Sequence, residues 1–379
     1  MASYNFVVAP PKIEDRVFVK PLLCGPGPCD VYPSVSEAYE KPVIFHAGDE
    51  YFNVMDDIRA GIQYIFQTRS KLVLAMSGAG HTGMEAVISN LVGPKETLLI
   101  ASRGIWDERA NIMAKRYGKK IYLELLEREL KRLRPTALFI TVGDSSTGSV
   151  QNIVGLGHIC HKYGTLLLVD TVVSLVGVPF FMDEWGVDAV YTSSQKVLSG
   201  PAGISPVAFS ARAEQKINNR QFEPPFYFDI KLLAPQWNCY GDTRYYHHTL
   251  SPPLLWALRC CLQEISKETL PKIWARHEES SAHFYKRMEE LSFQFFIPKP
   301  VDRLPTVITI VLPKGYDYVK FSKYMIDNHK IVINAGLGPT AGKALRIGIM
   351  GVNSTTQVAD AVADAMADTR KALALRSSL

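Results

Sequence analysis

Between residues 70 and 210 the sequence alternates short apolar runs, rich in strand-forming residues, with stretches of helical character. The runs are Leu72–Met76, Thr97–Ala101, Ala137–Val142, Thr165–Val169, Ala189–Thr192 and Ser205–Phe209. This alternation is typical of a mostly parallel sheet covered by helices on both faces, so we predict an α/β fold. In such sheets the side chains that carry chemistry collect at the carboxyl ends of the strands. Functional residues are therefore expected in the loops that follow these runs.

The length of the chain and a change of pattern near residue 251 predict two domains. A single core usually stops growing at roughly 250 to 300 residues, and this chain has 379. We expect an amino-terminal arm over residues 1–20, a large domain over 21–268 and a small α+β domain over 269–379. One long helix, from about Ser251 to Met288, is expected to lead across the boundary.

Charge and composition argue against several classes of protein. Lys and Arg number 42 against 37 Asp and Glu, and the basic residues are scattered, which does not favour a nucleic-acid partner. The apolar runs are too short for a membrane span, and residues 1–12 lack the features of a secretory signal. The six cysteines show no CxxC pair, so we predict no metal site and no disulfide framework, and a reducing compartment fits best.

Lys196 and Asp170 follow two of the predicted strands. A lone lysine after a strand is more often a solvated loop residue, so Lys196 by itself indicates little. Asp170 ends a strand expected to be fully buried, where a carboxylate is costly unless a cation pairs with it. A protonated pyridine nitrogen is such a cation, and the pair would keep a pyridine ring an effective electron sink. The alternative role for Asp170 is that of a helix N-cap.

Three further features would suit a flat, phosphorylated ligand. The segment Ser77–Gly83 places glycines at a helix start, where backbone N–H groups attract a phosphate, although such a turn could also mark a dinucleotide site. Gly78, Gly80 and Gly83 have the GxGxxG spacing, which is a weak signal by itself, and GxxxxGK(S/T) is absent from this turn. Trp106 is either a core residue or an aromatic ring stacked on a heterocycle. Arg346 interrupts an apolar strand and is either an ion-pair partner or a clamp for a carboxylate.

These motifs and several others follow one another in the order of a known family. They are Gly25–Pro28, Ser77–His81, Gly104–Trp106, Gly143–Gly148, Val169–Asp170, Ser194–Lys196, Tyr246–Thr249, Gly336–Pro339 and Leu345–Gly348. The pattern resembles the class V aminotransferases of fold type I, and specifically the alanine–glyoxylate, or serine–pyruvate, aminotransferase group with its insect 3-hydroxykynurenine transaminase relatives. The resemblance covers nearly the whole chain.

The resemblance implies a fold and a cofactor site. The fold would be that of a fold type I transferase dependent on pyridoxal 5′-phosphate (PLP), with a mostly parallel seven-stranded sheet in the large domain. Lys196 would carry PLP as a Schiff base and act in catalysis together with Asp170, the partner of the ring nitrogen. The other residues expected around the cofactor are Ala79, Gly80, His81, Trp106, Ser145 and Gln195, with Tyr246 and Thr249 supplied by the neighbouring subunit of a homodimer.

The resemblance also implies substrates, which are small amino acids and 2-oxo acids. Arg346 would grip the substrate carboxylate, and Gly27, Val43, Ile44 and Ser145 would line the substrate pocket. Val43 and Ile44 have no hydrogen-bonding side-chain groups, whereas hydroxykynurenine-handling relatives carry a polar pair there. We therefore favour L-alanine as donor and glyoxylate as acceptor, with 3-hydroxykynurenine transaminase or serine–pyruvate aminotransferase activity as the alternative.

Two segments call for separate expectations. Tyr117–Leu123 runs almost directly into the helix expected at Glu124–Arg134, where the family usually inserts a strand and a longer loop, so we expect a shortened element at the sheet edge. Arg376–Leu379 resembles a variant of the Ser-Lys-Leu peroxisomal address and predicts a peroxisomal location, or otherwise a cytoplasmic one.

Other classes of protein fit this sequence less well. A cysteine desulfurase on this fold needs a reactive cysteine in its carboxyl-terminal part, and no cysteine follows Cys261. A nucleotide-binding oxidoreductase would need, besides the glycine-rich turn, an acidic residue at the end of the next strand, and the run Thr97–Ala101 does not end in one. A cofactor-binding module without turnover is disfavoured because Lys196, Asp170 and Arg346 are all intact.

Overall fold

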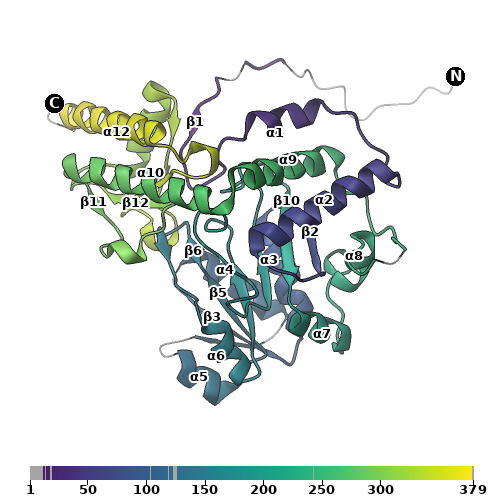
Figure 1. Ribbon diagram of the computed structural model, residues 1–379. Helices are drawn as coiled ribbons and strands as arrows, with labels where there is room; N and C mark the ends of the chain where they lie inside the picture. Colours follow the sequence, from purple (N-terminus) through teal and green to yellow (C-terminus); the bar gives the residue numbers. More distant parts are fainter. Residues whose placement is uncertain are drawn as a thin grey trace, which may run out of the picture.

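The computed structural model describes residues 12, 14–17, 19–102, 104–117, 119–122, 126–241 and 243–377, with the side chains of 117–126 and 375–377 outside the description. Its main feature is a seven-stranded sheet in the order β2-β10-β9-β8-β5-β3-β4 (Figure 1). The bounds are β2 Val73–Ser77, β3 Thr97–Ala101, β4 Lys119–Tyr122, β5 Ala137–Thr141, β8 Leu166–Asp170, β9 Ala189–Tyr191 and β10 Ile204–Phe209. Only β10 runs antiparallel to its neighbours, and the other pairs are parallel. The predicted mostly parallel, seven-stranded sheet is confirmed.

Burial explains why the middle strands are almost continuously apolar. Every residue of β5, β8, β9 and β10 is buried, as expected of strands covered on both faces. The covering helices include α2 (Asp49–Phe66), which packs against β2 and β10, and α3 (Gly80–Leu91), which packs against β9 and β10. On the other half of the sheet, α4 (Ile105–Tyr117) packs against β3 to β5 and α6 (Leu156–Lys162) against β8.

The element expected to be shortened at the sheet edge is the strand β4. It has four residues and pairs in parallel with β3 from Thr97 to Ile100, so the edge strand is present although it is brief. The helix that follows is α5, described over Leu126–Leu133 within the expected span Glu124–Arg134. Glu124 itself lies outside the described residues.

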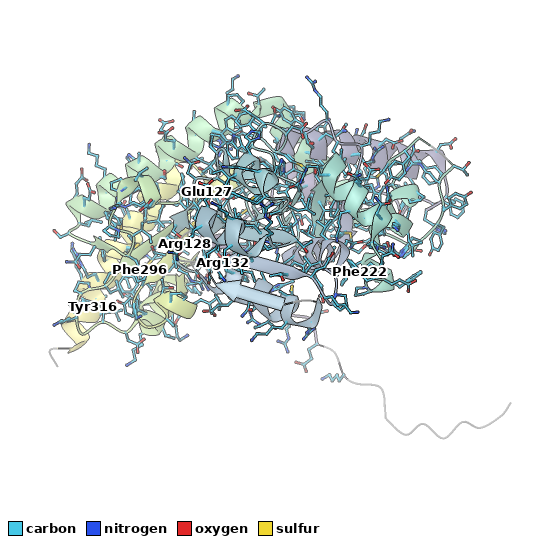
Figure 2. All side chains as sticks on the ribbon, turned by 90° about the horizontal axis from the view of Figure 1, so that it is seen from below. Glu127, Arg128, Arg132, Phe222, Phe296 and Tyr316 are labelled. Atoms are coloured by element: carbon cyan, nitrogen blue, oxygen red, sulfur yellow. The ribbon has the colours of Figure 1, made fainter. Side chains whose placement is uncertain are left out.

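The helix α5 makes polar contacts to the end of α6 and within itself. Glu127 accepts a hydrogen bond from the buried Tyr163 hydroxyl at 3.1 Å, which joins α5 to the end of α6. Arg132 forms an ion pair with Glu129 one turn away. Figure 2 labels Glu127, Arg128 and Arg132 on this helix.

A second, separate hydrophobic core surrounds an antiparallel sheet of four strands in the order β11-β12-β15-β14. Its elements are β11 Gln294–Phe295, β12 Val307–Val311, β14 Asn334–Ala335, β15 Leu345–Gly348, α10 Leu270–Glu290, α11 Tyr318–Tyr324 and α12 Thr356–Ser377. They lie together at one end of the molecule, on the left in Figure 1. The short strand β1 (Leu22–Leu23) pairs with β13 (Ile331–Val332), so the chain just after the expected arm joins this second core. The residue boundaries of the domains stay a prediction.

The helix expected from Ser251 to Met288 is two helices. The first, α9, covers Pro252–Glu268, and α10 starts at Leu270. Thr269 between them has φ +73°, outside the helical region, and Pro271 has no N–H with which to continue the helical ladder of α9. The expectation of one continuous helix was wrong because proline at a helix start marks a new helix.

The remaining elements are short. They are α1 Pro33–Glu37, α7 Ala211–Asn219, α8 Ile230–Gln236, β6 Gly143–Asp144 and β7 Ser149–Val150, with single 3-10 or π turns over 38–40, 226–228, 300–302, 325–329, 338–340 and 351–353. Over the described part of the chain, no helix combines the length and apolar character that a membrane crossing needs. All six cysteines are buried free thiols.

His277 of α10 gives a testable link between pH and stability. Its Nε2 accepts a hydrogen bond from the Gly351 N–H at 3.0 Å, so Nδ1 must carry the proton that is donated to the Ile273 carbonyl at 2.8 Å. Burial lowers the pKa of His277 from 6.5 to about 3. Below pH 6.5 this imidazole becomes protonated in the unfolded chain but stays neutral in the folded chain. The free energy of unfolding therefore falls as pH falls.

We expect His277 to contribute a loss of about 2 kcal/mol in the free energy of unfolding between pH 6.5 and 5.0, at about 1.4 kcal/mol per pH unit. Urea unfolding of the wild type and of His277→Gln over this range measures it, since the variant keeps the other titrating groups. The variant should show the shallower slope against pH. Equal slopes in the two proteins would contradict this account of His277.

Candidate active site

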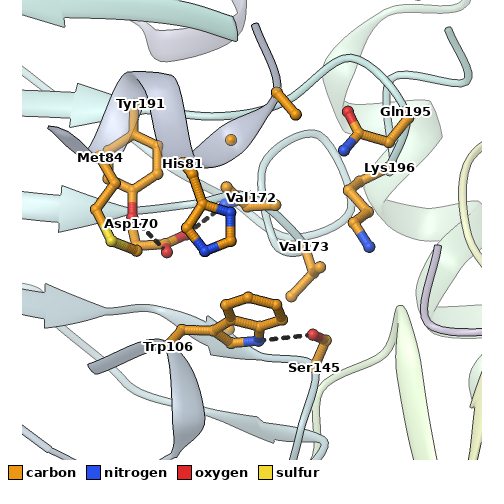
Figure 3. A pocket seen from close by; sticks show the side chains of 13 residues that line it. His81, Met84, Trp106, Ser145, Asp170, Val172, Val173, Tyr191, Gln195 and Lys196 are labelled. Carbon is orange, nitrogen blue, oxygen red and sulfur yellow. Dashed lines mark hydrogen bonds between the residues drawn. The ribbon is translucent and has the colours of Figure 1, made fainter. Parts of the chain in front are cut away.

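A cavity of about 250 Å³ lies at the carboxyl ends of β8 and β9, beside the start of α3 (Figure 3). Its walls come from Ala79, Gly80, His81, Met84, Trp106, Gly143, Ser145, Asp170, Val172, Val173, Tyr191, Gln195 and Lys196. The sheet-end position is the one expected for an α/β fold. All the residues predicted to surround a cofactor within one chain line this cavity.

Lys196 reaches the cavity from the loop after β9. Its Nζ donates a hydrogen bond to the Pro26 carbonyl at 2.7 Å. Gly27 has φ +96°, and a Cβ there would lie 2.3 Å from the Lys196 Cδ, so only glycine lets the two segments approach this closely. Burial lowers the pKa of Lys196 to about 8, and the Arg346 guanidinium adds to this effect against the opposing influence of Cys29 and Asp170. The amine is therefore far more easily deprotonated than that of an ordinary lysine.

Asp170 is the last residue of β8 and is only 3% exposed. Its carboxylate accepts hydrogen bonds from the Tyr191 hydroxyl at 2.6 Å and from the Val172 N–H at 2.8 Å. Burial raises the pKa of Asp170 to about 7; these two donors lower it, and the nearby carboxylates of Asp107 and Asp144 raise it. A cation brought into the cavity would favour the ionised form.

The glycine-rich turn forms the amino end of α3. Its N-cap residue is Ala79, which has no side-chain acceptor for the first N–H groups of the helix. A Cβ on Gly80 would lie 3.2 Å from the Val172 side chain, so the turn sits close against the strand that ends at Asp170. The positive end of the helix dipole and the unpaired N–H groups of a helix start attract anions. This wall can hold a phosphate.

Two aromatic side chains and a serine shape the opposite wall. The Trp106 indole donates from Nε1 to the Ser145 hydroxyl at 2.8 Å, and its ring meets that of His81 edge to face at 5.8 Å (Figure 3). Burial lowers the pKa of His81, and Arg109 lowers it further, so the imidazole stays neutral near pH 7. On the far side, the Ser193 hydroxyl donates to the Gln195 carbonyl oxygen and fixes the amide of Gln195. Its NH₂ group is then the end that can donate.

Arg346 approaches the cavity from β15 of the second core. It is 8% exposed, and its Nη1 donates to the Ser145 carbonyl at 3.3 Å while its Nε donates to the Ala335 carbonyl at 3.1 Å. Burial lowers its pKa, but an arginine starts so high that it remains charged. A charged fork next to the cavity wall is suited to a carboxylate.

Four predicted site residues lie away from this cavity in the single chain. Tyr246 is 63% exposed, and its hydroxyl lies 2.8 Å from that of Thr249. Val43 is 79% exposed, whereas Ile44 is buried in the large core. The roles expected for them at the cofactor and the substrate stay predictions.

Five residues of the cavity wall were not predicted from the sequence. They are Met84, Gly143, Val172, Val173 and Tyr191. Tyr191 had a usable signal, because it ends the strand next to that of Asp170, and parallel neighbours place their final residues side by side. The valines follow Asp170 directly but carry no chemical signature. Among the described residues, no group of three or more His, Cys, Asp and Glu side chains could hold a metal ion.

The depressed pKa of Lys196 predicts selective reactivity. In the cofactor-free chain, Lys196 should react with trinitrobenzenesulfonate at a rate that reaches half its maximum near pH 8, because only the neutral amine is nucleophilic. Mass-spectrometric peptide mapping after brief exposure at each pH measures this rate, with exposed lysines of the same digest as the comparison. A rate at Lys196 still rising steeply above pH 9.5 would refute the depressed pKa.

The chain has close relatives of known activity and structure. The aminotransferase class-V family model matches residues 34–361. The alanine–glyoxylate aminotransferase of Rattus norvegicus is 42% identical, over 97% of this chain and 92% of that protein, and the Drosophila melanogaster enzyme of the same name is 43% identical, over 94% of each. The crystal structure of alanine–glyoxylate aminotransferase from Nostoc sp. aligns with TM-score 0.91 at 36% identity, covering 94% of this chain and 97% of that one.

A more distant solved structure extends the likeness of fold. The pyridoxamine–pyruvate aminotransferase from Mesorhizobium loti aligns with TM-score 0.88 at 22% identity, over 93% of both chains. The fold is accordingly that of the fold type I aminotransferases, a group that uses PLP. With the family model covering most of its length, this chain is a transaminase and belongs to the class-V aminotransferase family.

Proposed function

We propose that this chain is a PLP-dependent aminotransferase that moves the amino group of L-alanine to glyoxylate, giving pyruvate and glycine. The observation that carries the proposal is the cavity in which the Lys196 amine, the Asp170 carboxylate and the Trp106 indole border one space. The substrate pair is taken from the rat and fly relatives, which are alanine–glyoxylate aminotransferases at 42% and 43% identity.

The residues of the cavity fit PLP in shape and in charge. The start of α3 offers backbone N–H groups to the phosphate at a point where a Cβ on Gly80 would crowd Val172. Trp106 and Val172 offer apolar surface to the two faces of a ring. Asp170 offers an anion to a ring nitrogen, and the Lys196 amine is the group that an aldehyde requires. Each of the four chemical parts of PLP thus has a matching group.

PLP, when bound, supplies an electron sink that stabilises negative charge at the substrate Cα. Lys196 would hold the cofactor covalently through Nζ and, once the substrate amine displaces it, move a proton at Cα. This step needs a neutral amine near physiological pH, which the pKa of about 8 favours. Asp170 would keep the ring nitrogen protonated, since a nearby carboxylate favours the cationic form.

Arg346 would bind the carboxylate that L-alanine and glyoxylate share. Its two hydrogen bonds to backbone carbonyls fix the plane of the guanidinium next to Ser145. Lysine could not replace it with the same geometry, because a single ammonium lacks the fork of donors. Gly27 lies against Lys196 and leaves space where any side chain would collide with the reactive amine.

A homodimer is part of the proposal, because it explains the position of Tyr246 and Thr249. Their hydroxyls lie outside the cavity of their own chain, on a surface where Phe45 and Tyr245 are 69% and 67% exposed. Clustered exposed aromatic side chains are typical of interfaces between proteins. In the dimer these hydroxyls would reach the phosphate bound by the other subunit. Val43, on the same exposed side of the chain, would meet a substrate only across such an interface.

A peroxisomal location remains a proposal that rests on the sequence alone. The variant address includes Ser378 and Leu379, which lie outside the described residues. Nothing in the fold bears on it.

The proposed function makes a prediction about the cofactor and the substrate pair. Purified protein with PLP should show a visible absorption band that L-alanine removes and glyoxylate restores. Lys196→Ala should lose this band and nearly all turnover, because no other amine borders the cavity at that point. Full activity in Lys196→Ala would refute the proposal, and a band that only 3-hydroxykynurenine removes would refute the substrate assignment while leaving the cofactor in place.

The second prediction concerns the shared site. Lys196→Ala should be inactive, and Tyr246→Phe combined with Thr249→Val should bind PLP roughly a hundredfold more weakly, since two hydrogen bonds to a charged phosphate are lost. Co-expression of the two variants with different affinity tags gives mixed dimers. These should contain one complete site and recover about half the wild-type activity at low PLP. Failure to recover activity in the mixed dimers would show that the hydroxyls do not act across the interface.

A further inference from the structure

Tyr191 and Asp170 form a buried pair on neighbouring strands. They stand opposite each other in the parallel register of β8 and β9, at the last residue of each strand. The Tyr191 hydroxyl donates to Oδ2 of Asp170 at 2.6 Å, and the two residues are 0% and 3% exposed. Figure 3 shows this bond at one end of the cavity, away from Lys196.

The ring of Tyr191 has little freedom to move. It stacks on Phe139 of β5 with ring centroids 6.5 Å apart and planes 27° from parallel. On the other side Gly83 of α3 packs so tightly that a Cβ there would lie 2.9 Å from the Tyr191 Cβ. A residue clamped between a helix and a strand presents its hydroxyl in one direction. The direction of the donor therefore fixes the direction of the Asp170 carboxylate.

The surroundings of Asp170 otherwise work against its charge. Asp107 on α4 and Asp144 on β6 are both buried carboxylates near it, and both raise its pKa in addition to the larger effect of burial. The groups that favour the ionised form are the Tyr191 hydroxyl, the Val172 N–H and, across the cavity, the Lys196 amine. Burial and Asp170 raise the pKa of Tyr191 well above 10, so the phenol stays protonated and remains a donor.

We propose that Tyr191 is a positioning residue that orients the Asp170 carboxylate and keeps it ionised, so that it can hold the proton on the pyridine nitrogen of the cofactor. The inference rests on the proposed function, because it needs PLP in the cavity. A proton shared between the ring nitrogen of PLP and the Asp170 carboxylate can reside on the nitrogen or on a carboxylate oxygen. The Tyr191 hydrogen bond is stronger to a carboxylate than to a carboxylic acid and so favours the arrangement in which the nitrogen carries the proton.

The decisive variant is Tyr191→Phe, which removes one oxygen and keeps the clamped ring. Its matched control is Tyr163→Phe, since Tyr163 is also buried and also donates to a carboxylate, that of Glu127, but lies at α6 outside the cavity. Equilibrium dialysis in the absence of substrate gives the dissociation constant of PLP. We expect it to rise about tenfold in Tyr191→Phe, the loss of one charge-assisted hydrogen bond, and to stay unchanged in Tyr163→Phe.

A second readout reports the proton directly. The ¹⁵N chemical shift of PLP labelled at its ring nitrogen distinguishes the protonated from the unprotonated atom. In Tyr191→Phe at pH 7.5 it should move towards the unprotonated value, and kcat should fall with little change in KM for L-alanine. An unchanged dissociation constant and an unchanged ¹⁵N shift would overturn the inference.

A cycle with Asp170→Asn separates positioning from a general loss of structure. If Tyr191 acts through the carboxylate, Tyr191→Phe should change the dissociation constant less than about twofold when Asp170 is already Asn. An equal change in both backgrounds would mean that the hydroxyl only supports the fold, and would overturn the inference. PLP binding by the wild type separates the proposed function from the role of Tyr191. If the wild type does not bind PLP, the proposed function fails. If the wild type and Tyr191→Phe bind PLP equally tightly, only the role of Tyr191 fails.

Discussion

A buried carboxylate at the end of the central strand is the constraint on which the site depends. Asp170 is 3% exposed, and burial raises its pKa to about 7 although the hydrogen bonds from Tyr191 and Val172 lower it. Its charge is tolerable only where donors and a cation surround it. The parallel pairing of β8 with β9 places Tyr191 beside it, and the turn after β8 supplies the Val172 N–H. The register of β8 and β9 thus supplies one of the two hydrogen bonds that favour the ionised form of Asp170.

The second constraint is the junction between the two cores. Four successive carbonyls of the loop 145–148 accept hydrogen bonds from residues far along the chain: Ser145 from Arg346 at 3.3 Å, Ser146 from Thr340 at 2.6 Å, Thr147 from Thr309 at 2.8 Å and Gly148 from the Leu304 N–H at 2.9 Å. Backbone groups bonded in this way cannot shift singly. These bonds therefore fix the position of the Arg346 guanidinium relative to the Ser145 hydroxyl, which accepts the hydrogen bond from Trp106. The two groups come from different parts of the fold.

The sequence sufficed for the parts of the site that follow from strand ends. Asp170 and the glycine-rich turn at Ala79–His81 were predictable because apolar runs reveal the strands, and parallel strands gather their carboxyl ends at one edge, whereas Lys196 gained its role through the family resemblance. The antiparallel direction of β10 and the helix break at Thr269 were not, because both depend on tertiary pairing or a single backbone conformation. Ser145 and Arg346 were named through the family resemblance, since no local pattern states that residues two hundred positions apart are in contact. Tyr246 and Thr249 lie outside the cavity of their own chain, so their expected role at the cofactor stays a prediction.

Burial disfavours the charged forms of both Lys196 and Asp170 in the cavity wall. Burial lowers the pKa of Lys196 to about 8 and raises that of Asp170 to about 7, so both groups are pushed towards their neutral forms although they lie in the same space. The start of α3 and the Arg346 guanidinium add positive potential beside the cavity. A ligand with an anionic phosphate, an anionic carboxylate and a basic ring nitrogen balances each of these charges separately. A phosphorylated pyridine bound together with an amino acid carries these three groups, which is the combination that the proposed function requires.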